Sequence, residues 1–371
     1  NVFIPVQKLN EIRRQGLDAL TDAITKQYKR EVTSKNELNK EYNKESNFKA
    51  NQEECLNNFS LLKDTLTHEI STEIKLNSKN SGSTTPNITV SVNSKDQLFA
   101  ACNINEVNSI YIDSDIVPLN QLNELTSYVT NHGKKCYIIL PHIFRKATYE
   151  LFARNKKVLE DNTINGFILR NLEEYYFVTN ELDQIIPKKE LITDYNLYVM
   201  NRHASYFWHE LGVNKHTAPI ELNYSELKDL SGLYSDIIVY GKIPLMVTAQ
   251  CFSKTMSGEV NTNYSKSTNN PCCKADVKEI ELKDRFQKGF QITRHCRECY
   301  NTIYNSQCLS LLQNSFEINS LNTNAIRLNF TFETEQETKD VIHSFVQAYI
   351  YKQKVDEIKD FTRGHFKRGI E

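Results

Sequence analysis

Five of the nine cysteines lie between residues 251 and 299, and together they could hold a metal. They are Cys251, the adjacent pair Cys272 and Cys273, and Cys296 and Cys299, which are separated by two residues. A C-x-x-C segment places two thiolates on one tight turn, and thiolates from separate loops complete a shell of four. Such a shell suits both structural zinc and a four-iron four-sulfur cluster, which spacing alone does not separate. We therefore predict a metal or cluster site in this segment, with one member of the adjacent pair as a bystander.

The cysteines could also serve in two ways that need no metal. Disulfides suit a secreted chain, but the odd cysteine count, the lack of a signal peptide and the abundance of Lys, Glu and Asn favour a reducing cytoplasm. Cysteines can also be small buried hydrophobes, which we expect of Cys102 and Cys136 within apolar stretches. That role fits poorly for Cys296 and Cys299, which have polar and charged neighbours. We expect a cytoplasmic protein with a thiolate site.

The composition narrows the class of protein. A chain of 371 residues and 43.1 kDa is long enough for two or three domains. No apolar run approaches the ~18 residues of a membrane span, so no membrane partner is expected. The formal net charge of −1 means that any contact with RNA or DNA would have to come from a local basic patch. The opening at Asn1 suggests a piece of a longer chain.

The pattern of apolar and polar residues predicts five parts. An amphipathic helix pattern follows an extended start, a polar stretch follows the helix, and short β-branched runs then alternate with helical segments. The parts are an N-terminal strand–helix segment that ends a preceding domain (1–31), a polar linker or insertion (32–87), a βα barrel (88–250), a cysteine-rich region (251–310) and a C-terminal α+β extension (311–371).

The alternating region is typical of βα units. Seven or eight strands at intervals of roughly 20 to 30 residues favour an α/β fold of the (β/α) barrel type, possibly an incomplete one, with an open doubly wound sheet as the competitor. The expected strands are 88–92, 109–112, 136–140, 166–169, 197–200, 219–222, 237–240 and an eighth at 245–249. Neither a G-x-G-x-x-G motif nor a P-loop motif occurs, so a dinucleotide or nucleotide phosphate site has no support.

The C-terminal extension has a different pattern. Residues 325–332 alternate as a half-buried strand, and Thr334 with Glu337 predicts a helix capping box. The last residues interleave two glycines with Arg363, His365, Lys367 and Arg368. This composition favours a loop that contacts an anion.

Polar residues that directly follow barrel strands are the natural candidates for chemistry, because strand carboxyl ends point toward the active face of a barrel. Arg170 could bind a carboxylate or phosphate with both arms of its guanidinium, or pair with Glu173 or Glu174. Glu221 could lie in the barrel mouth or be a surface acid. The full set of candidates is Asp113, His142, Arg170, Asn171, Asn201, Glu221, Asn223 and Tyr240.

Classical hydrolase machinery is missing from the sequence. The chain has neither the G-x-S-x-G motif of serine hydrolases nor the H-E-x-x-H motif of zinc peptidases. His142 could act as an acid or base, or simply cap a loop. Cys308 could be a nucleophile, but nothing in the sequence places a histidine beside it.

Several segments together resemble the collagenase-like peptidase family U32. In order and spacing they are similar to the C-terminal half of its long bacterial members, and they cover nearly the whole chain outside the polar insertion. The segments are 3–6 with 9–14 (FIPV, LNEIRR), 239–246 with 250–251 (VYGKIPLM, QC), 282–285 (LKDR), 296–306 (CRECYNTIYNS), 327–333 (RLNFTFE) and 362–369 (TRGHFKRG).

This resemblance implies an iron–sulfur enzyme more than a hydrolase. Similar members hydroxylate a tRNA wobble uridine or a ribosomal RNA cytidine, and others hold a four-iron four-sulfur cluster on four cysteines. By motif, the ligands here would be Cys251, one of Cys272 and Cys273, Cys296 and Cys299. The chain departs from the family pattern at residues 243–245, where related members have an earlier cysteine, and at Cys308, where related chains have proline.

The hypothesis from the sequence is therefore an RNA hydroxylation enzyme whose partners are tRNA or ribosomal RNA, a small carboxylate cosubstrate and the N-terminal half of the same protein. Its candidate catalytic residues are Glu221, Arg170, His365 and Arg363. The alternatives are a peptidase that acts on collagen-like or other peptides, and a non-catalytic scaffold that carries a cluster. A four-cysteine zinc site would be structural, because its shell is closed.

Overall fold

The computed structural model describes residues 6–28, 85–114, 117, 119–182, 188–230, 235–250, 252, 280–296 and 298–369. The chain divides into two compact units, Asn1–Gly82 and Ser83–Glu371. In the first unit the described residues form helix α1 (Val6–Tyr28), as the apolar spacing predicted. Its apolar side chains at Ile12, Leu17, Leu20 and Ile24 are about half exposed. Most of the predicted linker, 32–87, lies outside the described residues.

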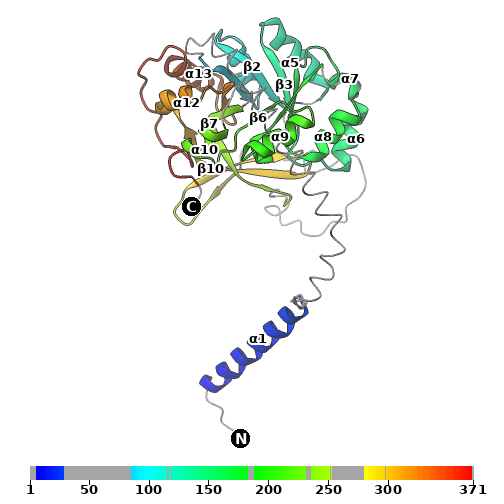
Figure 1. Cartoon of the computed structure of the whole chain (residues 1–371), viewed down its shortest axis with the longest axis vertical. Coiled ribbons are helices and arrows are strands. Elements are labelled where there is room, and N and C mark those ends of the chain that lie inside the picture. The colour runs from blue at the N-terminus through cyan, green and yellow to red at the C-terminus, as the bar shows by residue number, and fades with distance from the viewer. Residues whose placement is uncertain are drawn as a thin grey trace, which may run out of the picture. The chain divides into compact units, whose positions relative to one another are not determined.

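The second unit is a closed barrel of eight parallel strands, which confirms the predicted fold class (Figure 1). Each strand pairs with the next, and β11 pairs with both β7 and β1 to close the ring. The strands are β1 (Asn87–Val92), β2 (Val107–Asp113), β3 (Lys135–Ile139), β4 (Gly166–Leu169), β5 (Glu190–Thr193), β6 (Lys215–Thr217), β7 (Ser235–Thr248) and β11 (Ala325–Asn329).

Helices surround the barrel, and several begin where the sequence provides a cap. The Ser94 side chain accepts a hydrogen bond from the backbone N–H of Gln97, and Thr334 with Glu337 forms the predicted capping box. The helices are α4 (Lys95–Cys102), α5 (Leu119–Asn131), α6 (Lys146–Arg154), α7 (Lys156–Leu159), α8 (Leu172–Asn180), α9 (Arg202–Glu210), α10 (Tyr224–Leu230), α12 (Ser315–Ser320) and α13 (Glu335–Tyr349), with 3-10 turns η1 (Tyr195–Leu197) and η3 (Leu312–Asn314).

Three of the predicted strands were wrong. Residue 197 ends the 3-10 turn η1, and Tyr198 directly after it has a left-handed conformation, so the fifth strand is β5, which precedes this turn. Residues 219–222 form a turn, since Pro219 has no N–H to donate to a strand ladder, and β6 precedes it. Residues 245–249 overlap the far end of β7, so the eighth strand is β11, from the predicted C-terminal extension.

An antiparallel sheet extends from the carboxyl end of the barrel. Beyond Gly241, β7 continues and pairs with β10 (Tyr300–Ser310), which pairs with β9 (Gly289–His295), which pairs with β8 (Ile280–Lys283). The short β12 (Phe361–Thr362) lies parallel to β10. Gly241 has a φ of 136°, and a Cβ there would lie 2.3 Å from the Asn329 carbonyl oxygen. Only glycine fits where β7 passes from the barrel into this sheet.

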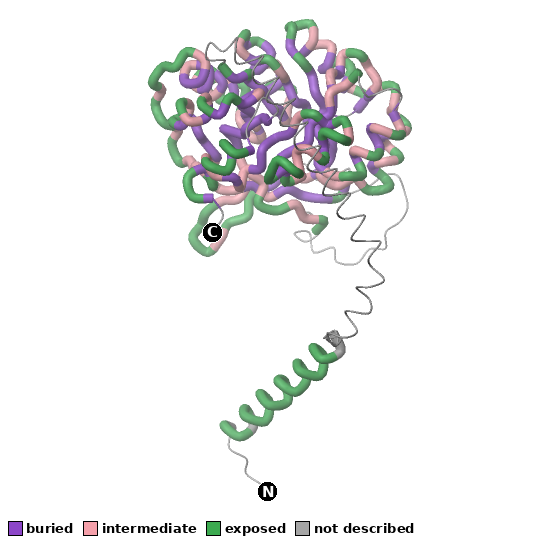
Figure 2. Tube along the Cα trace, in the orientation of Figure 1, coloured by how far each residue is buried: buried purple, intermediate pink, exposed green. Residues whose placement is uncertain are grey.

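The barrel strands are buried along most of their length (Figure 2), and their buried side chains form two layers. The outward layer packs against the helices and forms the main hydrophobic core. The inward layer has a small apolar cluster of Tyr111, Tyr137, Ile139, Ile168 and Ile192. The rest of the barrel interior is polar and charged. None of the helices among the described residues combines the length and hydropathy that a bilayer span requires.

Candidate functional site

Four charged side chains lie together at the carboxyl end of the barrel interior, and we call them the mouth network. Asp113 ends β2, Arg170 directly follows β4, Asp194 directly follows β5, and Arg327 points inward from β11. All four side chains are at most 9% exposed. Strand alternation explains the inward direction, because each lies an even number of residues from an inward neighbour such as Tyr111, Ile168 or Ile192.

The mouth network is held by ion pairs that cross the barrel. Arg170 Nε donates to Asp194 Oδ2 at 3.1 Å, while its Nη1 and Nη2 both donate to Asp113 Oδ2 at 3.2 Å. Arg327 Nη1 donates to the other oxygen of Asp194 at 2.7 Å and lies 3.4 Å from Thr217 Oγ1. Two cations and two anions therefore balance within a buried layer.

The pKa values follow from this pairing. Burial alone would raise the pKa of Asp194, but the charges of Arg327 and Arg170 lower it to about 2. Burial would lower the pKa of Arg170, and Asp113 and Asp194 instead hold it well above its ordinary value. All the guanidinium arms of Arg170 are used, so it is not the free anion receptor that the sequence suggested. The predicted ion pair with Glu174 is also absent among its described contacts, since Glu174 accepts from the Arg170 backbone N–H at 2.6 Å.

His142 lies beside this layer, in the segment after β3. Burial and the nearby positive charge of Arg170 lower the pKa of His142 well below its ordinary value. The imidazole is therefore neutral at physiological pH. A neutral imidazole can donate one hydrogen bond and accept another, which suits it to orient a ligand rather than to hold a charge.

The turn between β9 and β10 lies next to the mouth network. His295 ends β9 and stacks on Tyr300, the first residue of β10, with ring centroids 4.1 Å apart. His295 contributes to the lowered pKa of His142, and Tyr300 to the raised pKa of Arg170, so both rings lie within electrostatic range of the mouth. Both rings are buried.

Cys296 and Cys299 lie in that turn. Cys299 is exposed, has a left-handed φ of 57°, and its Sγ lies 3.7 Å from the Cys296 carbonyl oxygen. Such a tight turn with accessible thiols fits the donor pair expected of a metal or cluster knuckle. No group of three metal-ligating side chains occurs among the described residues. The other predicted ligands, Cys251, Cys272 and Cys273, lie outside those residues.

A hydrogen bond ties this turn to the end of the β7 extension. Asn301 Nδ2 donates to the carbonyl oxygen of Gln250 at 2.5 Å, and Asn301 pairs with Thr248 across the sheet. Gln250 directly precedes Cys251 in the sequence. Asn301 lies two residues after Cys299, so this hydrogen bond holds the segment before Cys251 close to the turn that contains Cys299.

The remaining candidate catalytic residues lie in a separate corner of the carboxyl end. Glu221 follows β6 in a turn, and its Oε2 is buried with no hydrogen-bond partner among the described residues. Arg363 Nη2 donates to Glu357 Oε1 at 3.1 Å, and His365 Nδ1 lies 2.9 Å from the Gly369 carbonyl oxygen. The Tyr224 N–H donates to the Phe366 carbonyl at 2.8 Å, which holds the C-terminal loop beside this turn. No hydrogen bond or ion pair between described residues joins this corner to Arg170.

Several of the strand-end candidates have structural roles. The Asn171, Asn201 and Asn223 side chains accept hydrogen bonds from backbone N–H groups three residues ahead, as helix caps do. Tyr240 Oη donates to Glu333 Oε1 at 3.1 Å. Burial and the charge of Glu333 raise the pKa of Cys308 to about 12. The Cys308 thiol is protonated at neutral pH and is not an activated nucleophile.

Sequence reasoning missed Asp194 and Arg327, the two residues with the shortest ion pair of the mouth. Asp194 directly follows β5, and polar residues directly after barrel strands were the expected candidates. Because the fifth strand was predicted at 197–200, Asn201 was selected in its place. Arg327 lies in the middle of β11, which ends at Asn329 rather than at residue 332 and is buried on both faces rather than on one. A charged residue between two apolar neighbours, Ile326 and Leu328, was the signal of an inward charge that needs a buried partner.

Fold and site together define a (β/α)-barrel protein with a charged mouth bordered by a C-x-x-C turn. The model of "Peptidase family U32" matches residues 113–365, more than half of the chain, and the chain belongs to this family. The match includes the mouth network, Cys296 and Cys299. No curated protein sequence matches the chain.

Three solved structures are similar at low identity. The 3-dehydroquinate dehydratase from Aquifex aeolicus VF5 is 14% identical over 41% of this chain and 77% of its own, with a TM-score of 0.29. The orotidine 5'-monophosphate decarboxylase from Methanocaldococcus jannaschii is 17% identical over 42% of this chain and 82% of its own, with a TM-score of 0.31. An uncharacterized B. cereus protein is 10% identical over 70% and 65%, with a TM-score of 0.36. This likeness is too low to transfer an activity.

Proposed function

We propose that this chain is the barrel part of an iron–sulfur enzyme that hydroxylates a pyrimidine at carbon 5 in tRNA or ribosomal RNA. The carrying observation is the position of the C-x-x-C turn, which lies between β9 and β10 in the sheet that extends from the carboxyl end of the barrel. The ring pair His295 and Tyr300 at its base lies within electrostatic range of His142 and Arg170 of the barrel mouth. A redox centre would then lie within reach of a base in the mouth. The resemblance of the chain's motifs to those of the RNA-hydroxylating members of its family supports the proposal as well.

Four thiolates would hold the cluster: Cys296, Cys299, Cys251 and one of Cys272 and Cys273. The fit rests on the described pair, which places an exposed Cys299 thiol on a left-handed turn three residues after Cys296. When bound, a cluster supplies the electron-transfer capacity that hydroxylation of an unactivated pyrimidine carbon requires and that side chains lack.

The residues of the chain itself would bind and orient the base. The mouth network forms a rigid, electrically balanced floor, since each guanidinium is fixed by carboxylates from other strands. The neutral His142 beside it can donate to and accept from the edge of a pyrimidine. The buried rings of His295 and Tyr300 would exclude water on the side of the turn.

The C-terminal loop would contact the RNA backbone. His365, Lys367 and Arg368 are exposed on a loop that is bonded to the segment after β6, at the same end of the barrel as the mouth. Phosphate contacts of this kind are independent of sequence and weaken with salt. A small carboxylate cosubstrate would have to use groups other than Arg170, whose arms are occupied.

Anaerobic purification tests the cluster. The full protein should contain iron and sulfide and absorb near ~400 nm, and Cys299→Ser should lose both. Cys308→Ser is the matched control, since Cys308 is half-buried against Tyr240 and Glu333 and should leave iron content unchanged. Colourless, iron-free protein from strictly anaerobic cells would refute the cluster.

Nucleoside mass spectrometry tests the reaction. A deletion strain should lack one 5-hydroxypyrimidine, and the wild-type gene should restore it while the Cys299→Ser gene should not. If the Cys299→Ser gene restored the 5-hydroxypyrimidine, the reaction would not need the cluster, and the proposal would be contradicted.

The peptidase alternative makes the opposite prediction for Cys308. A cysteine peptidase would lose turnover of collagen-like peptides with Cys308→Ser, whereas the raised pKa of this thiol predicts no such activity to lose. If peptide hydrolysis co-purified with the wild-type protein and was absent from Cys308→Ser, the peptidase alternative would be favoured.

A further inference from the structure

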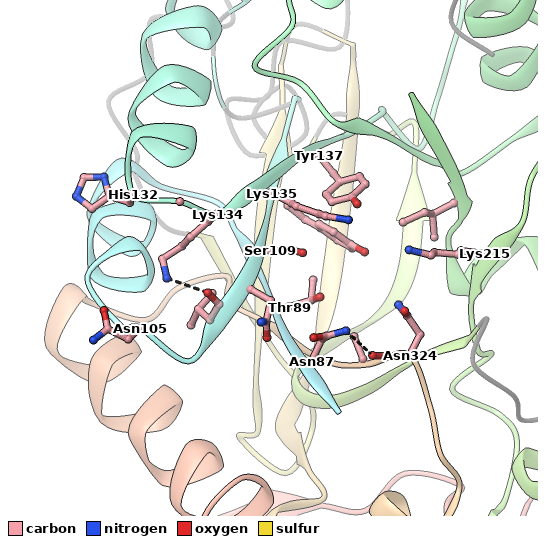
Figure 3. Close-up of a pocket in the computed structure, with 16 residues that line it drawn as sticks. Asn87, Thr89, Asn105, Ser109, His132, Lys134, Lys135, Tyr137, Lys215 and Asn324 are labelled. Atoms are coloured by element: carbon pink, nitrogen blue, oxygen red, sulfur yellow. Dashed lines mark hydrogen bonds between the residues drawn. The ribbon is translucent and has the colours of Figure 1, made fainter. Parts of the chain in front are cut away.

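A cavity of about 410 Å³ opens at the opposite, amino end of the barrel (Figure 3). Its wall is built from the first residues of the strands, including Asn87 of β1, Lys135 of β3 and Lys215 of β6. Volumes in this range hold small molecules. In barrels of this type the amino end is normally packed for stability, so an open polar cavity there points to a further role.

The charge of this cavity is positive. Among the described residues that line it there are three lysines and no carboxylate. Lys135 and Lys215 extend toward each other across it (Figure 3), and both pair with one carboxylate, Glu190, at 3.5 and 2.9 Å. The third, Lys134, donates to the carbonyl oxygens of Ile104 and Val107. Two ammonium groups thus share a single counter-charge.

One further acid, Asp236, lies deeper in the barrel. It accepts hydrogen bonds from Tyr111 Oη at 2.9 Å and Asn324 Nδ2 at 2.6 Å. Burial raises the pKa of Asp236, while these two hydrogen bonds and the charges of Arg327 and Lys215 act to lower it. Tyr111 and Asn324 lie between Asp236 and the cavity, because they line its wall and Asp236 does not.

The rest of the lining is rich in amides and hydroxyls. Asn108 uses its Oδ1 to accept from the Ile88 N–H, and Asn324 uses its Nδ2 on Asp236, so each amide has its other end for a ligand. The polar lining consists of Asn87, Asn105, Asn108, Asn324, Thr89 and Ser109. Alternating donors and acceptors of this kind recognise hydroxyl groups, and little apolar surface is offered.

We propose that this cavity binds a phosphorylated polyol of the sugar phosphate class. Its phosphate would bind between Lys135 and Lys215, since a phosphate monoester carries close to two negative charges and accepts several hydrogen bonds. Its hydroxyls would contact the asparagine amides. The cavity is much larger than a phosphate ion, so the uncharged polar groups of its wall leave room for the polyol part of the ligand. The site is independent of the proposed RNA chemistry, which lies at the other end of the barrel.

Isothermal titration calorimetry of the full chain tests this assignment. Ribose 5-phosphate should bind, and ribose and inorganic phosphate should each bind at least about tenfold more weakly. Lys215→Gln should weaken ribose 5-phosphate binding about tenfold, as loss of one charge-assisted contact predicts. Lys146→Gln is the control, because this lysine is 92% exposed on α6 and pairs only weakly, at 3.9 Å, with Glu150.

A gain-of-affinity variant separates binding from misfolding. Glu190→Gln removes the shared counter-charge and keeps an acceptor for Tyr137 Oη and Lys215, so ribose 5-phosphate should bind more tightly. The absence of heat with ribose 5-phosphate at millimolar concentration would overturn the proposal. So would equal affinities in Lys215→Gln and Lys146→Gln, or inorganic phosphate binding as tightly as ribose 5-phosphate.

Discussion

The two ends of the barrel use charge in opposite ways. At the carboxyl end, Arg170 and Arg327 are buried and their charges are matched by Asp113 and Asp194. At the amino end, Lys135 and Lys215 are 56% and 27% exposed and share one carboxylate at the edge of a cavity. Matched buried charges fix one another and give a rigid surface. Partly exposed ammonium groups that share one carboxylate keep hydrogen-bond donors available to a ligand.

Tyr111 marks the boundary between the two ends. Its hydroxyl donates to Asp236 on the amino side, and the Arg327 guanidinium lies 5.1 Å from its ring centroid on the carboxyl side. The Tyr111 ring also contacts Tyr137 edge to face. The barrel interior is therefore continuous, and the contrast between its ends can be tested by substitutions at each.

The largest effect should come from Asp194→Ala. This change leaves two buried guanidinium groups without their shared carboxylate, which should lower the free energy of unfolding by about 3–5 kcal/mol. Urea denaturation measures it. The control Glu150→Ala removes only an exposed ion pair of 3.9 Å and should cost below ~1 kcal/mol. Equal costs would show that the mouth network contributes no more than a surface pair.

The next effect is a loss of stability in acid. The pKa of Asp194 is about 2 in the folded chain, below its ordinary 3.8, so its contribution is complete above pH 3.8 and is lost as the pH falls toward 2. The shift corresponds to about 2 kcal/mol. Unfolding free energies between pH 5 and pH 2 should fall more steeply for the wild type than for Asp194→Asn. Parallel profiles would contradict the low pKa.

Tyr111→Phe should have a smaller effect. It removes the hydroxyl that donates to Asp236 at 2.9 Å but keeps the ring under Arg327, so a loss of about 1 kcal/mol is expected. Tyr206→Phe on α9 is the matched control, because its hydroxyl donates to exposed Glu210. Urea denaturation should show no measurable change for this control. A larger loss of stability in Tyr206→Phe than in Tyr111→Phe would show that the buried hydrogen bond to Asp236 contributes less than the surface hydrogen bond to Glu210.

The smallest stability effect should come from Lys215→Gln at the amino end. Its ion pair with Glu190 is partly exposed, so the free energy of unfolding should change by less than ~1 kcal/mol. The same variant should bind ribose 5-phosphate about tenfold more weakly in calorimetric titration. A stability loss comparable to that of Asp194→Ala would mean that both ends are structural, and the contrast between them would disappear.

Local pattern allowed part of the site to be predicted. Asp113 and Arg170 follow strands whose apolar runs are continuous, so the strand-end rule selected both. The rule failed at β5 and β6, which are four and three residues long and carry charged residues at their starts. Such short strands are stabilised by their neighbours in the closed sheet, and their own sequences give little signal.

The sequence by itself determined the βα alternation, the helix caps and the C-x-x-C turn, because these depend on contacts between residues a few positions apart. Tertiary structure alone decided which charges are matched. Arg327 and Asp194 are 133 residues apart, so their pairing exists only once β11 closes the barrel. Arg170 and Asp113 are 57 residues apart and meet only once β2, β3 and β4 lie side by side. The pairing of β3 to β6 in the same sheet brings Lys135 and Lys215 to one shared carboxylate at the far end of the barrel.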